Sequence, residues 1–82
     1  MLWCNDIVKF IIDKSLEMGV QIYFYNRDND TYSFFSSYAN KDFIIILREE
    51  IAKYLSMMGK NFELNVKCAN DGFEVMLKER CE

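Results

Sequence analysis

The 82-residue sequence contains no histidine and no proline, and it has only three glycines and three cysteines. Without histidine the chain lacks the most common general base, the usual Ser-His and Cys-His catalytic pairs and the His-containing zinc sites. Three scattered glycines supply no glycine-rich loop that could hold a phosphate. The sequence therefore disfavours catalysis, and we expect a protein that is not an enzyme and uses neither a metal nor a cofactor.

The cysteines are also poor candidates for structural bonds. Cys4, Cys68 and Cys81 are odd in number and too far apart for a disulfide framework or a structural zinc site. The sequence shows neither a secretory signal nor an apolar run of the ~20 residues that cross a bilayer. We therefore expect a soluble, cytoplasmic protein that does not associate with membranes.

Apolar surface is what the chain has in abundance, since 51% of its residues are hydrophobic and 16% are aromatic. A chain of this length buries only about 60–65% of the surface that it exposes when unfolded, so apolar surface should remain after folding. Such surface usually marks an interface. The net charge of −3 disfavours nucleic acid, because neutralising phosphates supplies most of the affinity for it. We expect a protein partner, a second copy of the chain, or both.

Two sequence patterns occur twice. The pattern Ile-x-Lys-x-Leu-x-Met stands at 12–18 and again at 51–57. The pattern Asn-Asp-x-aromatic-x-apolar stands at 29–34 and again at 70–75. Repeats of this kind indicate units that bury their apolar faces against each other, although helix ends and hairpin turns also favour similar residues by chance. The patterns predict an internal duplication.

The duplication divides a single domain, residues 1–82, into halves of approximately 1–39 and 40–82. Each half reads as a helix, a strand, a turn and a second strand. We expect a pseudo-twofold axis that relates residues 7–35 to 46–76.

Capping signals and the spacing of apolar residues predict two helices. The first covers 5–18, with Asn5 as its N-cap, and the second covers 41–58, with Asn40 as its N-cap. Gly19 follows the first helix and Gly59 follows the second, where a glycine can adopt a left-handed backbone conformation.

Between and after the helices the apolar period changes from 3.6 to 2, which predicts two antiparallel hairpins. The fold class is therefore α+β, a two-layer sandwich of order α-β-β-α-β-β in which both helices cover one face of a four-stranded antiparallel sheet. Connection rules permit the strand orders 2-1-3-4 and 1-2-4-3. We expect the core to contain Val8, Ile12, Leu16, Ile22, Phe24, Phe34, Leu47, Ile51, Leu55, Phe62, Leu64, Val66, Phe73 and Val75.

Strand alternation places Tyr23, Tyr25 and Phe35 opposite core residues such as Phe24, on the face of the sheet that the helices leave open. The equivalent positions of the second hairpin are polar. We expect these three rings to form the main partner-binding surface, because exposed rings bury a large area in interfaces. The alternatives are stacking on the bases of single-stranded nucleic acid and aromatic pairing that only stabilises the sheet.

Two further surfaces are candidates for partner binding. Asp6, Asp13 and Glu17 form an acidic stripe on the first helix, which could contact a basic protein surface. Ile46 and Met57 lie outside the apolar stripe of the second helix, close together around its axis.

These features predict a small cytoplasmic protein-interaction module. Its size and acidity suit an inhibitor or regulator, of the type that phages or other mobile elements encode, which binds a larger protein. The alternative is a binder of single-stranded nucleic acid. A minor alternative is a thiol-dependent enzyme that uses Cys4, since a helix N-terminus lowers the pKa of a thiol, although Cys4 also fits the apolar face of its helix.

Overall fold

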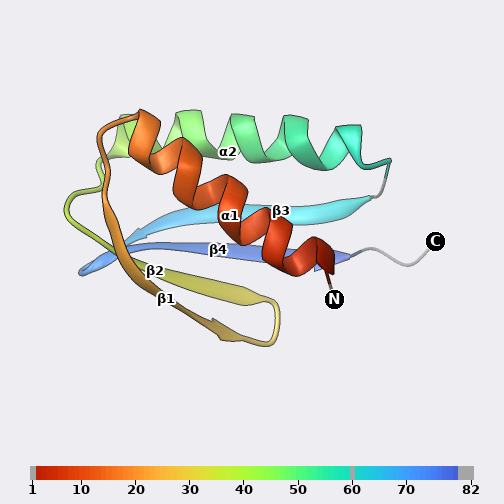
Figure 1. Cartoon of the computed structure of the whole chain (residues 1–82), viewed down its shortest axis with the longest axis horizontal. Helices are drawn as coiled ribbons and strands as arrows, with labels where there is room; N and C mark the ends of the chain where they lie inside the picture. Colours follow the sequence, from red (N-terminus) through yellow and green to blue (C-terminus); the bar gives the residue numbers. More distant parts are fainter. Residues whose placement is uncertain (1, 60, 80–82) are drawn as a thin grey trace.

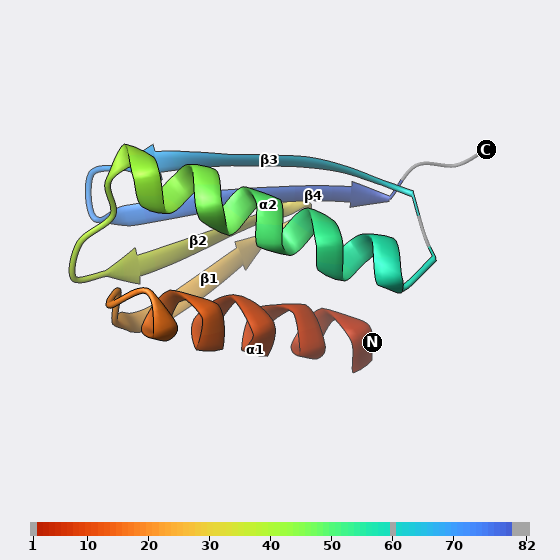
Figure 2. The ribbon, with the colours of Figure 1, turned by 90° about the horizontal axis from the view of Figure 1, so that it is seen from above.

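The computed structural model describes the backbone of residues 2–59 and 61–79, and the side chains of 6–59 and 61–78. The elements are α1 (Leu2–Glu17), β1 (Ile22–Asp28), β2 (Thr31–Ser36), α2 (Lys41–Met57), β3 (Phe62–Ala69) and β4 (Gly72–Glu79). Both helices lie on the same face of one sheet, which gives two layers (Figures 1 and 2). The predicted fold class and element order are confirmed.

The four strands are antiparallel and lie in the order β1-β2-β4-β3, which is one of the two predicted orders. The two hairpins meet through β2 and β4, so that β1 and β3 are the edges of the sheet. This arrangement is compatible with a pseudo-twofold axis between the hairpins. The internal duplication itself stays a prediction.

The two helices differ in how they begin. Asn40 caps α2 as predicted, because its side-chain oxygen accepts a hydrogen bond of 2.8 Å from the backbone N–H of Phe43. The prediction for the first helix is wrong at its start: α1 begins at Leu2, so Asn5 lies within the helix and is not its N-cap. No proline or glycine precedes Asn5 to stop the helix, and a capping residue type alone does not fix where a helix begins.

The core lies between the helices and the inner face of the sheet, which we call the helix face. Most predicted core residues are confirmed as buried, namely Val8, Phe34, Leu47, Ile51, Leu55, Val66, Phe73 and Val75. Four others are partly buried and pack against these, namely Ile12, Ile22, Phe62 and Leu64. Further buried residues that the prediction omitted include Ile7, Ile11, Tyr32 and Leu77.

Two predicted core residues are exposed, and the first is Leu16, whose side chain is 64% exposed. Its neighbour Ser15 is fully buried instead, and its hydroxyl donates a hydrogen bond of 2.7 Å to the backbone oxygen of Ile11. The buried stripe of α1 therefore runs through Ile7, Ile11 and Ser15 at a spacing of four residues. A serine hydroxyl that donates a hydrogen bond within its own helix can be buried. The prediction assigned the apolar Leu16 to the core instead of the polar Ser15, and was therefore wrong at this position.

Candidate functional site

An irregularity in β1 exposes the second misplaced core residue, Phe24. Ile22 pairs with Ser36 whereas Phe24 pairs with Phe35, so the strand contains one extra residue between these pairs. This is a β-bulge, and because side chains alternate with a period of two, it reverses the faces of the residues that follow. Phe24 therefore points to the sheet face away from the helices, which we call the open face, and is 59% exposed.

The bulge also separates the three predicted aromatic residues. Phe35 pairs with Phe24 on the open face, where the two rings stack with centroids 4.3 Å apart and an angle of 9° between their planes. Tyr25 pairs with the buried Phe34 on the helix face, with ring centroids 5.9 Å apart. The prediction that Tyr25 and Phe35 share one face is therefore wrong. Partner binding by these rings, or their stacking on nucleic-acid bases, stays a prediction.

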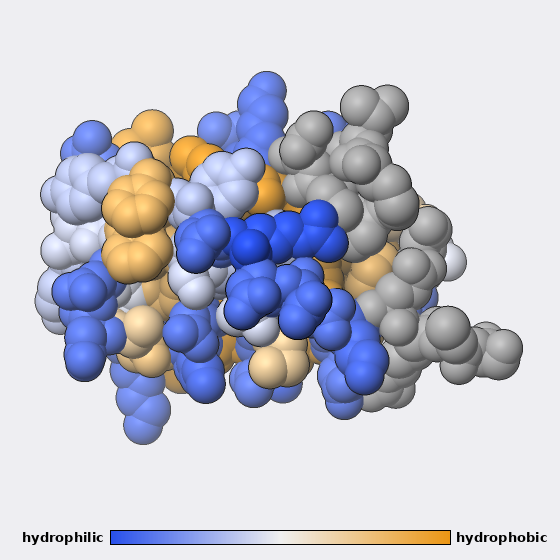
Figure 3. Space-filling model, turned by 90° about the horizontal axis from the view of Figure 1, so that it is seen from below, coloured by the Kyte–Doolittle hydropathy of each residue, from blue (hydrophilic) through white to orange (hydrophobic). Residues whose placement is uncertain are grey.

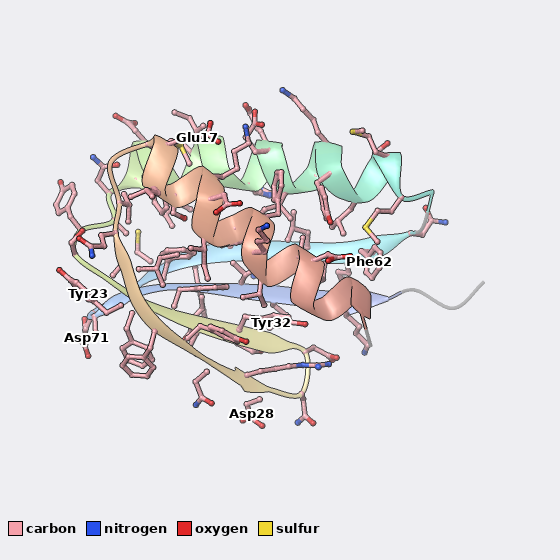
Figure 4. All side chains as sticks on the ribbon, viewed as in Figure 1. Glu17, Tyr23, Asp28, Tyr32, Phe62 and Asp71 are labelled. Atoms are coloured by element: carbon pink, nitrogen blue, oxygen red, sulfur yellow. The ribbon has the colours of Figure 1, made fainter. Side chains whose placement is uncertain are left out.

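Tyr23, the third ring, lies at the bulge and is exposed. In Figure 4 it lies at the end of the sheet that also carries Asp71, which precedes β4. The structure thus distributes the predicted aromatic surface over the open face, the helix face and one end of the sheet.

The open face is mostly hydrophilic, with only a small hydrophobic area near one end (Figure 3). The stacked pair of Phe24 and Phe35 belongs to this face, and Phe35 lies opposite Gly72, which has no side chain of its own. An aromatic residue opposite a glycine on a neighbouring strand can stabilise a sheet. This pairing supports the alternative that the two rings stabilise the sheet.

The acidic stripe is exposed as predicted, since Asp6, Asp13 and Glu17 all face solvent on α1. Lys14 lies 3.6 Å from the carboxylate of Glu17 and 3.5 Å from that of Glu50, so this lysine joins α1 to α2. Binding of a basic partner to the stripe stays a prediction.

Ile46 and Met57 are both exposed on α2, but the structure does not make them one surface. They are eleven residues apart, which corresponds to about 16 Å along a helix. Ile46 lines a hollow together with Met18 and Tyr38, whereas Met57 is the last residue of the helix.

A surface that the sequence did not reveal lies between α2 and the edge strand β3. One hollow of about 490 Å³ is lined mainly by apolar atoms, including those of Ile45, Ala52 and Val66. A second hollow of about 410 Å³ lies farther along, beside Ala52 and Leu64. Ala52 lines both hollows, so they are adjacent along β3, and we call the two together the α2/β3 groove.

The hydrogen bonds of β4 show which backbone groups of β3 face outward. Leu77 donates its backbone N–H to the oxygen of Asp30, at 2.8 Å, on the side of the first hairpin. The backbone oxygen of Asp71 accepts from Ser36 on the same side, at 3.0 Å. Since successive residues of a strand direct their N–H and C=O groups to opposite sides, the odd-numbered residues of β4 bond to β2 and the even-numbered ones to β3.

The residues of β3 opposite the even-numbered residues of β4 include Glu63, Asn65 and Lys67, so their backbone groups face β4. The alternating residues Leu64 and Val66 direct their N–H and C=O groups away from the sheet. Within the described part of the chain, no strand lies beyond β3. The edge of β3 therefore presents backbone donors and acceptors next to the α2/β3 groove.

Protein sheets usually protect their edges with prolines, bulges, short strands or charged side chains. β3 carries the charges of Glu63 and Lys67, but it has no proline and no bulge, and its eight residues from Phe62 to Ala69 pair with β4 without a register shift. The position of this edge depends on the strand order, which the sequence left open. Ile45 also lies outside the apolar stripe of its helix, and this is a sequence signal that could have indicated the groove.

Other kinds of site are not evident in the described part of the chain. No group of three or more cysteine, aspartate or glutamate side chains there is placed to hold a metal ion. Cys68 is exposed beside the groove, whereas the side chains of Cys4 and Cys81 lie outside the described residues. None of the described helices has the length and apolar character needed to cross a membrane.

Comparison with known proteins gives no family, because no protein-family model, curated protein or solved structure matches this chain.

Proposed function

We propose that this chain is a protein-binding module that acts by association rather than catalysis, and that it binds an extended polypeptide strand at the edge of β3. The observation that supports this proposal is the outward-facing backbone of Leu64 and Val66 beside the α2/β3 groove. An added strand would gain backbone hydrogen bonds from the edge, and alternate side chains would enter the groove.

The chemistry of the groove favours a polypeptide over a nucleic acid. The walls of the first hollow are mainly apolar, those of the second are more polar, and the charged residues of the groove are of both signs, with Lys41, Arg48 and Glu49. Nucleic-acid affinity comes mainly from neutralising many phosphates, whereas the groove has only one more basic than acidic residue and the chain has a net charge of −3. The cytoplasmic location and the role of inhibitor or regulator of a larger protein remain parts of this proposal.

A displayed library of linear eight-residue peptides tests the proposal. The wild-type chain is immobilised at low density, so that neighbouring copies do not meet. We expect enrichment of peptides in which apolar and polar residues alternate. Their binding should be lost with Leu64→Pro, which removes an outward donor of β3, and retained with Tyr25→Pro on the other edge. The proposal fails if no peptide is enriched, or if the enriched peptides bind Leu64→Pro as well as wild type.

A further inference from the structure

We infer that the strand that adds to β3 is β3 of a second copy of this chain, in an antiparallel register centred on Asn65. This inference rests on the proposed function. The two sheets would join across a twofold axis into one continuous sheet, with all helices on the same side. A twofold interface requires a surface that is complementary to itself, and β3 has such a sequence.

The self-complementary segment is Glu63-Leu-Asn65-Val-Lys67, in which an acid and a base stand at equal distances on either side of Asn65. When two such strands pair antiparallel around Asn65, Glu63 of each copy lies opposite Lys67 of the other. Opposite charges in directly opposed positions favour a pairing, and like charges disfavour it.

The same charges exclude the neighbouring registers. To keep both open faces on one side, odd-numbered residues must pair with odd-numbered residues, so the centre can move only one residue at a time along β3. Centres at Glu63 or Lys67 place like charges opposite each other. Centres at Leu64 or Val66 leave both charges opposite uncharged residues. Only the register centred on Asn65 pairs opposite charges.

Charges on β4 extend this pattern across the joined sheets. Within one copy Glu63 lies opposite Lys78, and Lys67 lies 3.6 Å from the carboxylate of Glu74. A row across the interface would therefore read Lys78, Glu63, Lys67 of the second copy and Glu74 of the second copy, with alternating signs. The twofold axis generates a second, equivalent row of charges on the other side of Asn65.

The backbone fits the same register. Leu64 would lie opposite Val66 of the second copy, and both residues direct their N–H and C=O groups outward, so each such pair exchanges two hydrogen bonds. The pairs of Glu63 with Lys67 then fall at the non-hydrogen-bonded positions, where the two Cα atoms approach to about 4.5 Å and side chains are closest.

The groove also fits a second copy. Ala52 lines both hollows, of which one adjoins Val66 and the other Leu64, so this small residue lies level with Asn65 at the proposed axis. A small residue there lets the two α2 helices approach. The α2/β3 groove of each copy would then be covered by the other copy.

Two charge variants test the register. Glu63→Lys places lysines at both paired positions, and Lys67→Glu places glutamates at both. Each variant alone should repel its own copies, whereas an equimolar mixture should form a heterodimer. Asp28→Lys and Lys9→Glu are matched controls, because they make the same charge changes at exposed positions away from β3. Circular dichroism confirms that each variant is folded.

Sedimentation velocity over a range of concentrations, with a reductant that keeps the exposed Cys68 from forming disulfides, gives the result. We expect a wild-type dimer, self-association weakened about tenfold or more in each β3 variant, and recovery in their mixture. Both controls should dimerise like wild type.

The inference is overturned if wild type is monomeric up to about 1 mM, or if the β3 variants dimerise as well as the controls. In either case, the proposed function would still be supported if the displayed peptides bind wild type and lose their binding with Leu64→Pro. Failure of both experiments would reject the function as well.

Discussion

The two edges of the sheet are built from corresponding strands, since β1 and β3 each follow a helix and open a hairpin. They differ in the regularity of the strand. β1 contains a bulge between Ile22 and Phe24, whereas β3 is regular along its whole length. A bulge twists and interrupts an edge, which hinders the pairing of a further strand along it. We therefore expect the one extra residue of β1 to protect this edge.

The largest expected effect comes from breaking the junction of the two hairpins. Gly72 has a φ of 155°, and a Cβ atom there would overlap the carbonyl oxygen of Phe34 in β2. Gly72→Ala should reduce the free energy of unfolding by about 3 kcal/mol, from backbone strain and the clash together, and so disrupt both edges.

Gly59→Ala is the matched control for Gly72→Ala. Gly59 has a φ of 73° but no heavy atom within 4 Å of an added Cβ, so only the backbone strain remains. We expect a loss of about 1 kcal/mol in urea unfolding. Equal losses in the two variants would show that the close approach of β4 to β2 is not tight.

The next effect separates the two edges directly. The alternation that directs Leu64 outward from β3 also directs Tyr25 outward from β1, because the residues beside it bond to β2. Leu64→Pro should weaken self-association about tenfold or more, whereas Tyr25→Pro should leave it unchanged in sedimentation velocity. If Tyr25→Pro weakened self-association more than Leu64→Pro did, the interface would be assigned to β1.

Removing the bulge should make the two edges alike. Deletion of Tyr23 joins Ile22 directly to Phe24 and restores regular pairing with β2. We expect species larger than a dimer in size-exclusion chromatography, because β1 would then be a second regular edge. A deletion variant that remains folded and has the wild-type oligomeric state would show that the bulge does not protect β1.

The smallest effect lies away from both edges, at Glu50. A hydrogen bond from Lys53, together with the charges of Lys53 and Lys14, lowers the pKa of the Glu50 carboxyl. A carboxyl whose pKa is lowered on folding stabilises the fold above its unfolded pKa, and this contribution is lost as the pH falls through the folded pKa.

Glu50→Gln should therefore be slightly less stable than wild type at pH 7 in urea unfolding, and the difference should vanish at low pH. The oligomeric state at pH 7 should not change. A difference in stability that persists in acid would mean that the ion pairs of Glu50 are not its cause.

The sequence was sufficient for the element order, the sheet with two helices on one face, and most of the core, because the apolar periods of α2, β3 and β4 are clear. It was not sufficient for β1, where Ile22, Tyr23, Phe24 and Tyr25 are all large and apolar or aromatic. Every one of these could face the core, so the pattern carries no signal of the bulge that reverses them.

The groove was missed for a different reason. It arises where α2 lies beside an edge strand, and the sequence allowed two strand orders that place different strands at the edge. Only the folded structure shows that β3, and with it the pattern around Asn65, lies at the edge. In the sequence alone, Glu63 and Lys67 resemble the solvent-exposed face of an ordinary strand. They suggest a pairing register only when β3 is known to lie at the edge of the sheet.

The most direct test of the difference between the edges is residue-specific amide hydrogen exchange, measured by NMR at low and high protein concentration. The amides of Leu64 and Val66 should exchange rapidly in dilute solution and become protected as the concentration rises. The outward amide of Tyr25 on β1 should exchange rapidly at both concentrations. Protection that stays low at Leu64 and Val66, or that rises equally at Tyr25, would contradict the assignment of β3 as the interface.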